Sequence, residues 1–183
     1  VVLAIPAKHS GGAAIALGNF DGLHAGHRAV IDRAREAAGR LGVELGVATF
    51  EPPPRRFFQP DAPPFRLMTP RRRELALAAI DVRQVHLLRF DAAMAAMTDR
   101  EFCQRVILDQ VGAASVSVGF DFRFGKGRMG DTDSLQRLGA EMGFEVNVVA
   151  EVKDSGAKVS SSRVRELLER GDMAGAATML GGE

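Results

Sequence analysis

The sequence contains no tryptophan, no tyrosine and a single cysteine, Cys103, among its 183 residues. One cysteine excludes an internal disulfide, and the near absence of thiols fits the reducing cytoplasm, which is the location we expect. Cys103 falls in a helical pattern with Phe102 and Val106. We therefore expect it to be a small core residue rather than a nucleophile.

Long apolar runs and a strong net charge are also lacking. No run approaches the roughly 20 residues of a membrane span, and no signal peptide is apparent, so a membrane partner is not expected. The net charge of +1 gives no global field that would attract nucleic acid. A hydrophobic content of 46% and a charged content of 26% instead favour one globular domain with a substantial core.

What the sequence does contain is an alternation of strand and helix patterns. Strands are predicted at residues 13–17, 43–50, 85–90, 115–119 and 144–149, and helices at 27–41, from Thr69, at 98–111, at 132–142, from about 160 to 170 and at 172–180. This alternation predicts an α/β fold of Rossmann-like type, with about five mostly parallel strands and helices on both faces. The spacing does not give the strand order.

A stretch rich in glycine and histidine, residues 18–27, lies between the first predicted strand and the first helix. We call it the histidine turn. The N-terminus of a helix presents unpaired N–H groups and the positive end of the helix dipole, which together favour phosphate. His24 and His27 would add side-chain donors. The alternatives are a tight connection with capping or packing histidines, or a two-histidine metal site, which lacks a third ligand at close spacing.

Seven of the eight prolines fall within residues 52–70, the proline segment. That density is too high for a helix or a central strand, so we expect a loop at the carboxyl end of the second strand. Ligands bind at this edge in open parallel sheets. A proline-rich surface linker is the alternative, but Phe50, Phe57, Phe58 and Phe65 would be costly to expose.

Residues 120–131, the aromatic loop, interleave phenylalanine, glycine and basic residues. Stacking rings beside cations suit a flat ring that carries a phosphate. Single-stranded nucleic acid would also suit this composition, although the rest of the chain offers no basic channel. Farther along, residues 160–162 are three serines at a predicted helix start, which indicates either helix caps or a second phosphate cradle completed by Arg165.

The histidine turn, GNFDGLHAGH, resembles the GxFDGxHxGH signature of the bacterial FAD synthetases, the adenylyltransferase part of bifunctional riboflavin kinase/FMN adenylyltransferase. These enzymes belong to the HxGH nucleotidyltransferase superfamily. Three later segments are similar to family motifs in the expected order: residues 49–52 to TFxP, 118–131 to VGxDFRFGxGRxGD, and 159–165 to ISSTxxR. Two positions depart, since Pro53 stands where the family often has histidine and Ser162 replaces threonine.

The resemblance implies that residues 1–183 form an FMN adenylyltransferase domain, which transfers AMP from ATP to FMN and releases FAD and pyrophosphate. It implies Mg²⁺ bound mainly through the ATP phosphates, and no nucleic-acid partner. The riboflavin kinase domain is absent from this chain, and we expect it to follow in the full-length protein. The implied catalytic residues, which would bind the ATP phosphates, are His24, His27, Ser161 and Arg165.

The resemblance also implies two sets of binding residues. The nucleotide would be bound by Gly18, Phe20, Asp21, Gly22, Gly26, Ser160 and Ser162. The flavin would be bound by Phe50, Pro52, Pro54, Phe58, Asp121, Phe124, Lys126 and Arg128.

Three other functions remain open at this level. Another HxGH-type adenylyl- or cytidylyltransferase could act on pantetheine phosphate, nicotinate or phosphocholine, although the aromatic loop disfavours it. A flavin-nucleotide binding module without turnover is the second alternative, with Pro53 as its hint. A binder of single-stranded nucleic acid is the third.

Overall fold

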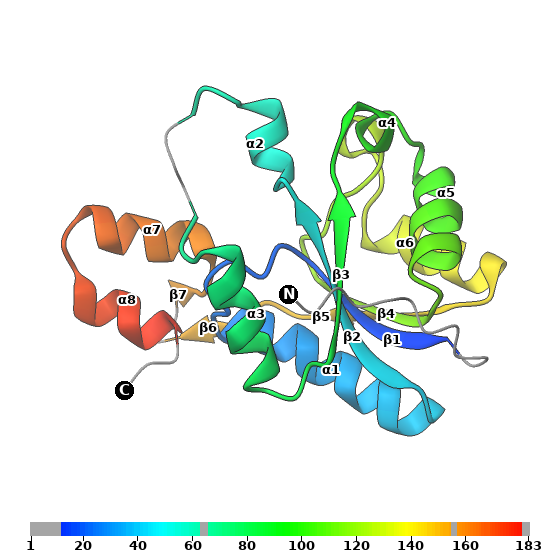
Figure 1. Cartoon of the computed structure of the whole chain (residues 1–183), viewed down its shortest axis with the longest axis horizontal. Helices are drawn as coiled ribbons and strands as arrows, with labels where there is room; N and C mark the ends of the chain where they lie inside the picture. Colours follow the sequence, from blue (N-terminus) through cyan, green and yellow to red (C-terminus); the bar gives the residue numbers. More distant parts are fainter. Residues whose placement is uncertain (1–11, 63–65, 155–156, 181–183) are drawn as a thin grey trace.

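The structure, a computed structural model, describes residues 12–62, 66–154 and 157–180. Its centre is a five-stranded sheet in the order β3-β2-β1-β4-β5, and every pairing within it is parallel over the described residues (Figure 1). The five predicted strands are confirmed as β1 (Ala13–Leu17), β2 (Glu44–Glu51), β3 (Gln84–Arg89), β4 (Ala113–Gly119) and β5 (Glu145–Val149).

Helices cover both faces of this sheet, as the α/β pattern predicts. Figure 1 shows α1 (Ala25–Leu41) and α3 (Pro70–Ala78) on one side, with α5 (Asp99–Phe102) and α6 (Thr132–Met142) on the other. The helix that begins with α5 continues as a π-helix, η1 (Cys103–Gln110). At the C-terminal end, α7 (Ser161–Glu169) and α8 (Met173–Leu180) lie side by side, beyond the edge of the sheet (Figure 1).

Most helix ends follow from local chemistry. Thr69 accepts a hydrogen bond from the Arg72 N–H and so caps α3, and Thr98 with Glu101 forms the predicted capping box of α5. Gly42 ends α1 at φ 67°, a left-handed conformation that glycine adopts without steric cost. These caps confirm the helix starts and stops expected from the sequence.

The structure corrects the expectation that the proline segment contains no helix. Its residues Pro54–Phe58 form a short helix, α2. Pro54 occupies the first helical position, where the missing N–H would have no intrahelical partner in any case, so proline is tolerated there. Phe65, which the sequence places in the same segment, lies outside the described residues.

Other short elements had no sequence prediction. They are α4 (Ala92–Ala95), the 3₁₀ turn η2 (Lys126–Arg128), and the hairpin of β6 (Lys153–Asp154) with β7 (Ala157–Lys158). The change from α to π geometry at Cys103 was also not predicted from the sequence.

Two apolar clusters fix the sheet between its helices. One contains Phe50, Phe102, Phe124 and Leu135, and the other contains Phe20, Ile31 and Leu77. Cys103 lies in the first cluster, and burial raises the pKa of its thiol to about 12, which confirms a packing role. Among the described helices, none is both long and apolar enough to span a bilayer.

Candidate functional site

The histidine turn and the aromatic loop leave the sheet from neighbouring strands. β1 and β4 are adjacent and parallel, so the turn after Leu17 and the loop after Gly119 begin at the same edge. The chain order reverses between these two strands. Ligands bind at such a switch point in doubly wound sheets. The two segments that the sequence singled out separately therefore belong to one candidate site.

His24 is the N-cap of α1, and its side chain is only 6% exposed. Its Nδ1 accepts a hydrogen bond from the His27 backbone N–H at 3.3 Å. An accepting Nδ1 places the proton of the neutral ring on Nε2, which makes Nε2 a donor. A Cβ on Gly26 would lie 3.2 Å from two atoms of the His24 ring, so this tight turn favours glycine. The capping alternative is thus correct for His24, and it leaves a donor available.

The His27 ring stacks on His24, with centroids 3.7 Å apart and an interplanar angle of 17°. Burial lowers the pKa of His24 to about 4, against a partly opposing effect of the Asp21 carboxylate. The pKa of His27 is lowered well below 6.5, mainly by burial and to a smaller degree by the neighbouring His24. Both rings are therefore neutral at pH 7. His27 Nδ1 is buried, and within the described part of the chain it has no hydrogen-bond partner.

We expect the free energy of unfolding to fall as the pH is lowered from 7 toward 5. The folded histidines have pKa values below 6.5, so the unfolded chain binds more protons in this window and acid favours unfolding. One such group contributes at most about 1.4 kcal/mol per pH unit. Urea unfolding at pH 7, 6 and 5 measures the slope. His24→Asn, which keeps a capping oxygen, should flatten it, whereas an unchanged slope would contradict the assignment.

Asp21 connects the histidine turn to two other parts of the chain. Its Oδ1 accepts hydrogen bonds from the backbone N–H groups of Leu67 at 2.9 Å and Met68 at 3.2 Å. Its Oδ2 lies 2.7 Å from Nη2 of Arg165, and its carbonyl oxygen accepts from Ser161 Oγ at 2.8 Å. The start of α7 is therefore in direct contact with the histidine turn, and the two predicted phosphate cradles lie together.

The remaining residues of the predicted nucleotide-binding set differ in burial and in the contacts that they make. Phe20 is fully buried and tilts against His27 with centroids 5.2 Å apart, so it supports the ring from beneath. Gly22 has φ 92°, and a Cβ there would lie 2.9 Å from Leu67 Cδ1. The N–H of Gly18 donates to the Ala48 carbonyl. Ser160 caps α7 by accepting from the Arg163 N–H, and Ser162 is exposed.

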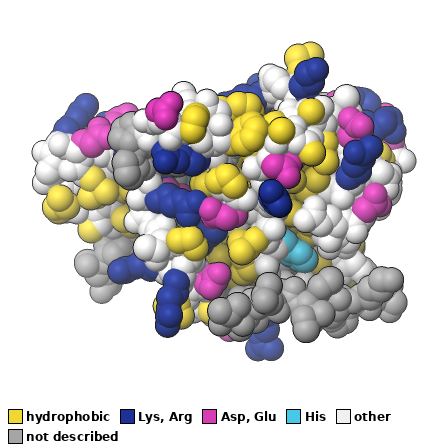
Figure 2. Space-filling model, turned by 45° about the horizontal axis from the view of Figure 1, so that its top comes forward, with side chains coloured by type: hydrophobic (Ala, Val, Ile, Leu, Met, Phe, Trp, Pro, Cys, Tyr) yellow, Lys and Arg dark blue, Asp and Glu magenta, His cyan; other side chains and the backbone are white. Residues whose placement is uncertain are grey.

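The predicted flavin residues divide into buried and exposed ones. Phe50 and Phe124 are built into the apolar core, at 7% and 6% exposure, whereas Phe58 on α2 is 62% exposed. Phe58 meets Phe57 and Phe90 edge to face, with centroids 5.2 and 5.8 Å away. Pro52 and Pro54 are half-buried beside them. Figure 2, which brings the α2 end of the molecule forward, shows hydrophobic side chains next to Lys and Arg side chains.

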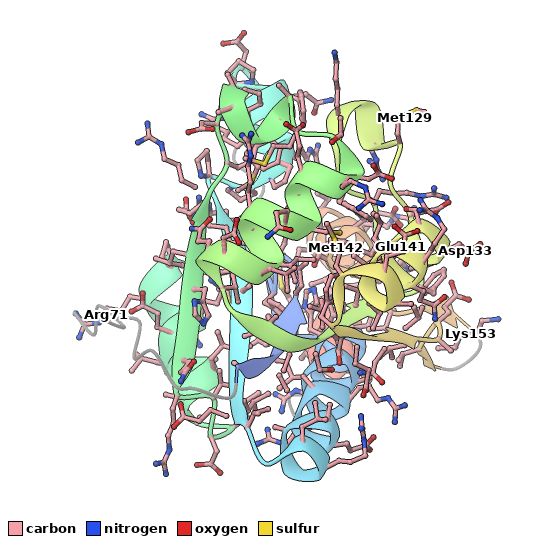
Figure 3. All side chains as sticks on the ribbon, turned by 90° about the vertical axis from the view of Figure 1, so that its right-hand side faces the viewer. Arg71, Met129, Asp133, Glu141, Met142 and Lys153 are labelled. Carbon is pink, nitrogen blue, oxygen red and sulfur yellow. The ribbon has the colours of Figure 1, made fainter. Side chains whose placement is uncertain are left out.

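The aromatic loop is closed on itself by paired backbone hydrogen bonds between Phe124 and Gly130. A Cβ on Gly130 would lie 2.8 Å from the Phe124 ring, so the close approach favours glycine there. Asp121, Lys126 and Arg128 are exposed. Met129 is 83% exposed, and Figure 3 shows it at the periphery of the molecule.

Sequence analysis missed a group of charged residues behind the histidine turn. Glu51, at the end of β2, pairs with Arg66 and lies 3.5 Å from Arg73. Arg73 is 6% exposed and donates to the carbonyl of Asn19. Arg73 is one of three consecutive arginines that all look like surface residues of a helix. Only the position of Leu77, one turn further along the buried face of α3, could have pointed to it.

Neither a metal-ligand cluster among the described residues nor the pocket on α3 marks this site. The described residues contain no group of three or more His, Cys, Asp or Glu side chains that could hold a metal ion. A shallow depression of about 490 Å³ lies on α3, lined by Thr69, Arg71, Arg72, Leu75 and Ala76, and it involves none of the predicted site residues. In Figure 3, Arg71 points away from the ribbon at the edge of the molecule.

Known proteins are similar to this chain in sequence. The family model described as FAD synthetase matches residues 7–163. The bifunctional riboflavin kinase/FMN adenylyltransferase of Pseudomonas fluorescens is 40% identical over 170 residues, and that of Escherichia coli K12 is 36% identical. Each alignment covers 93% of this chain and 54% of the relative, so the chain spans about half the length of these relatives.

A solved structure has the same fold. It is a Streptococcus pneumoniae protein named as a macrolide-efflux protein, with a TM-score of 0.80 and 27% sequence identity over 93% of this chain and 56% of that one. The family model spans most of the sequence, including the histidine turn, the aromatic loop and the start of α7. The chain therefore belongs to the FAD synthetase family.

Proposed function

We propose that this chain is an FMN adenylyltransferase, which transfers AMP from ATP to FMN and releases FAD and pyrophosphate. The observation that carries the proposal is the contact of the α7 start with the histidine turn through Asp21, at 2.7 Å to Arg165 and 2.8 Å to Ser161. Because these contacts hold the start of α7 against the histidine turn, we infer that one triphosphate reaches both helix starts. The relatives that match 93% of the chain bear this activity in their names.

The reaction requires alignment and charge neutralisation more than proton transfer. An oxygen of the FMN phosphate attacks the α-phosphorus of ATP, and the bond from that phosphorus to the bridging oxygen of pyrophosphate breaks. The attacking phosphate is already anionic, so it needs no general base. The histidines are neutral donors at the positive end of α1, where they can stabilise charge that develops on the α-phosphate oxygens.

Ser161 and Arg165 are proposed to hold the β- and γ-phosphates. Arg165 pairs with Asp21 in the free protein, but a guanidinium carries five donors and can bind a carboxylate and a phosphate together. Gly22, Gly26 and the serines at 160 and 162 would bring the backbone and hydroxyl groups close to the nucleotide. Mg²⁺ would neutralise the departing pyrophosphate, and we assign it to the phosphates, as the resemblance implies.

The flavin is proposed to stack on the exposed side of the phenylalanines on and beside α2. Phe58 offers an open ring face, and Pro52 and Pro54 extend the apolar surface. Because Phe50 and Phe124 are buried, we infer that they support this surface from beneath. Asp121, Lys126 and Arg128 lie on the exposed loop that would cover the bound ring and its phosphate.

The domain assignment is also a proposal. We propose that residues 1–183 form the adenylyltransferase domain, and that the full-length protein continues into a riboflavin kinase domain. The relatives support this proposal, because the chain matches only 54% of their length and they carry both activities in their names.

We expect the purified chain, supplied with ATP, FMN and Mg²⁺, to form FAD and pyrophosphate in equal amounts. Chromatography of the products and a pyrophosphate assay measure both. FMN binding without pyrophosphate release would instead support the flavin-binding module. Turnover of pantetheine phosphate, nicotinate mononucleotide or phosphocholine in place of FMN would support another HxGH-type transferase.

A further inference from the structure

The backbone of the histidine turn is held in a conformation that its residues do not favour. Phe20 has φ 48° and Leu23 has φ 45°, left-handed values that are unusual for side chains of this size. Such conformations persist only where the surrounding structure holds them in place. His24, the cap of α1 and a proposed phosphate ligand, follows directly after Leu23. The contacts that hold this turn therefore determine where the His24 ring lies.

The backbone carbonyl of Asn19 is hydrogen-bonded by side chains from two neighbouring elements. It accepts a hydrogen bond from Thr49 Oγ1 at 3.1 Å, and Nη1 of Arg73 lies 3.4 Å from the same oxygen. Thr49 is on β2, next to β1 in the sheet, whereas Arg73 is on α3. Asn19 immediately precedes the left-handed Phe20, so these donors act at the start of the strained part of the turn.

Arg73 also contacts the flavin side of the proposed site. Its Nη2 lies 3.5 Å from Oε2 of Glu51, the last residue before the proline segment, and Glu51 also pairs with Arg66. The guanidinium is nearly inaccessible, with 7% of the side chain exposed. A buried cation carries a large desolvation cost and persists where its partners are fixed. The Arg73 side chain thus contacts both the histidine turn and the end of β2.

We propose that Arg73 is a positioning residue for adenylyl transfer. It contacts the Asn19 carbonyl and the Glu51 carboxylate at the same time. It therefore fixes the position of the histidine turn relative to the start of the proline segment. Without it, the turn gains alternative conformations, and His24 and His27 spend less time in the productive geometry. The inference rests on the proposed function for its kinetic consequence, but its structural part, restraint of residues 20–24, does not depend on turnover.

The test compares Arg73→Met and Arg73→Lys with Arg72→Met, a matched control at an exposed position of the same helix. Arg73→Met should lower kcat/KM for ATP by about 10- to 100-fold, because small displacements of catalytic groups have effects of that size. Arg73→Lys, which retains one charged donor, should recover part of the loss. Arg72→Met should stay within about twofold of the unmodified chain. Hydrogen exchange of the backbone amides of residues 20–24 should be faster in Arg73→Met than in Arg72→Met or the unmodified chain.

If the unmodified chain forms no FAD, the proposed function fails, and hydrogen exchange still tests the restraint by Arg73. If Arg73→Met is folded and its 20–24 amides exchange no faster than in Arg72→Met, the inference is overturned. If Arg73→Met does not fold, Glu51→Gln is used in its place. That variant keeps the side-chain size, weakens the pair, and should also quicken exchange in the turn; unchanged exchange there would overturn the inference.

Discussion

Replacing His27 by alanine should slow FAD formation by about 10²- to 10³-fold while the protein remains folded. Removing one preorganised donor from an oxyanion-type site has effects of this size. His27 lies in the first turn of α1 and stacks on His24 with centroids 3.7 Å apart, and burial keeps its pKa well below 6.5. We propose that its neutral ring donates to the α-phosphate. Steady-state kinetics with varied ATP measure the loss. A fall in kcat together with kcat/KM would indicate an interaction made in the transition state.

His86→Ala is the matched control for His27→Ala. His86 is a half-buried histidine on β3, and burial lowers its pKa as well, but it belongs to none of the segments that form the proposed site. The rate of FAD formation by His86→Ala should stay within about twofold of that of the unmodified chain. Circular dichroism and thermal unfolding of both variants separate a loss of fold from a loss of chemistry. A folded His27→Ala protein with a rate less than tenfold below normal would remove His27 from the mechanism.

The second large effect is expected on stability. Asp21→Ala should lower the free energy of unfolding by about 2–4 kcal/mol, because it leaves a half-buried guanidinium and two backbone N–H groups without their acceptor. The carboxylate now accepts from Leu67 and Met68 and pairs with Arg165 at 2.7 Å. Urea unfolding at pH 7 measures the change. Asp32→Ala, which removes an exposed carboxylate from α1, should cost less than about 0.5 kcal/mol.

A double-mutant cycle tests whether Asp21 acts through Arg165. If much of the loss in Asp21→Ala comes from removing the Asp21–Arg165 ion pair, then Asp21→Ala combined with Arg165→Met should cost clearly less than the sum of the two single changes. Simple additivity would mean that the backbone contacts to Leu67 and Met68 carry the whole effect. A loss in Asp21→Ala no larger than in Asp32→Ala would remove Asp21 as the link between α7 and the histidine turn.

Periodicity and local chemistry account for what could be predicted of the fold. The five strands, the helix at 132–142 and the caps at Thr69 and Thr98 depend on apolar spacing and on side chains that bond to their own helix. The helix α2 does not follow from proline density, because the effect of a proline on a helix depends on its position. Pro54 stands at the first helical residue, where it does no harm.

For the candidate site, the sequence by itself determined which segments carry phosphate-binding and aromatic chemistry, since glycines, histidines, serines and phenylalanines at strand ends and helix starts act locally. The sequence also indicated the family, because the histidine turn and three later segments match the family motifs in the same order along the chain. Tertiary structure decided that Asp21 joins residues 67, 68, 161 and 165, that Phe50 and Phe124 are buried while Phe58 is exposed, and that Arg73 supports Asn19. These contacts join residues far apart in the sequence, and only the packing of α3 and α7 against the turn brings them together.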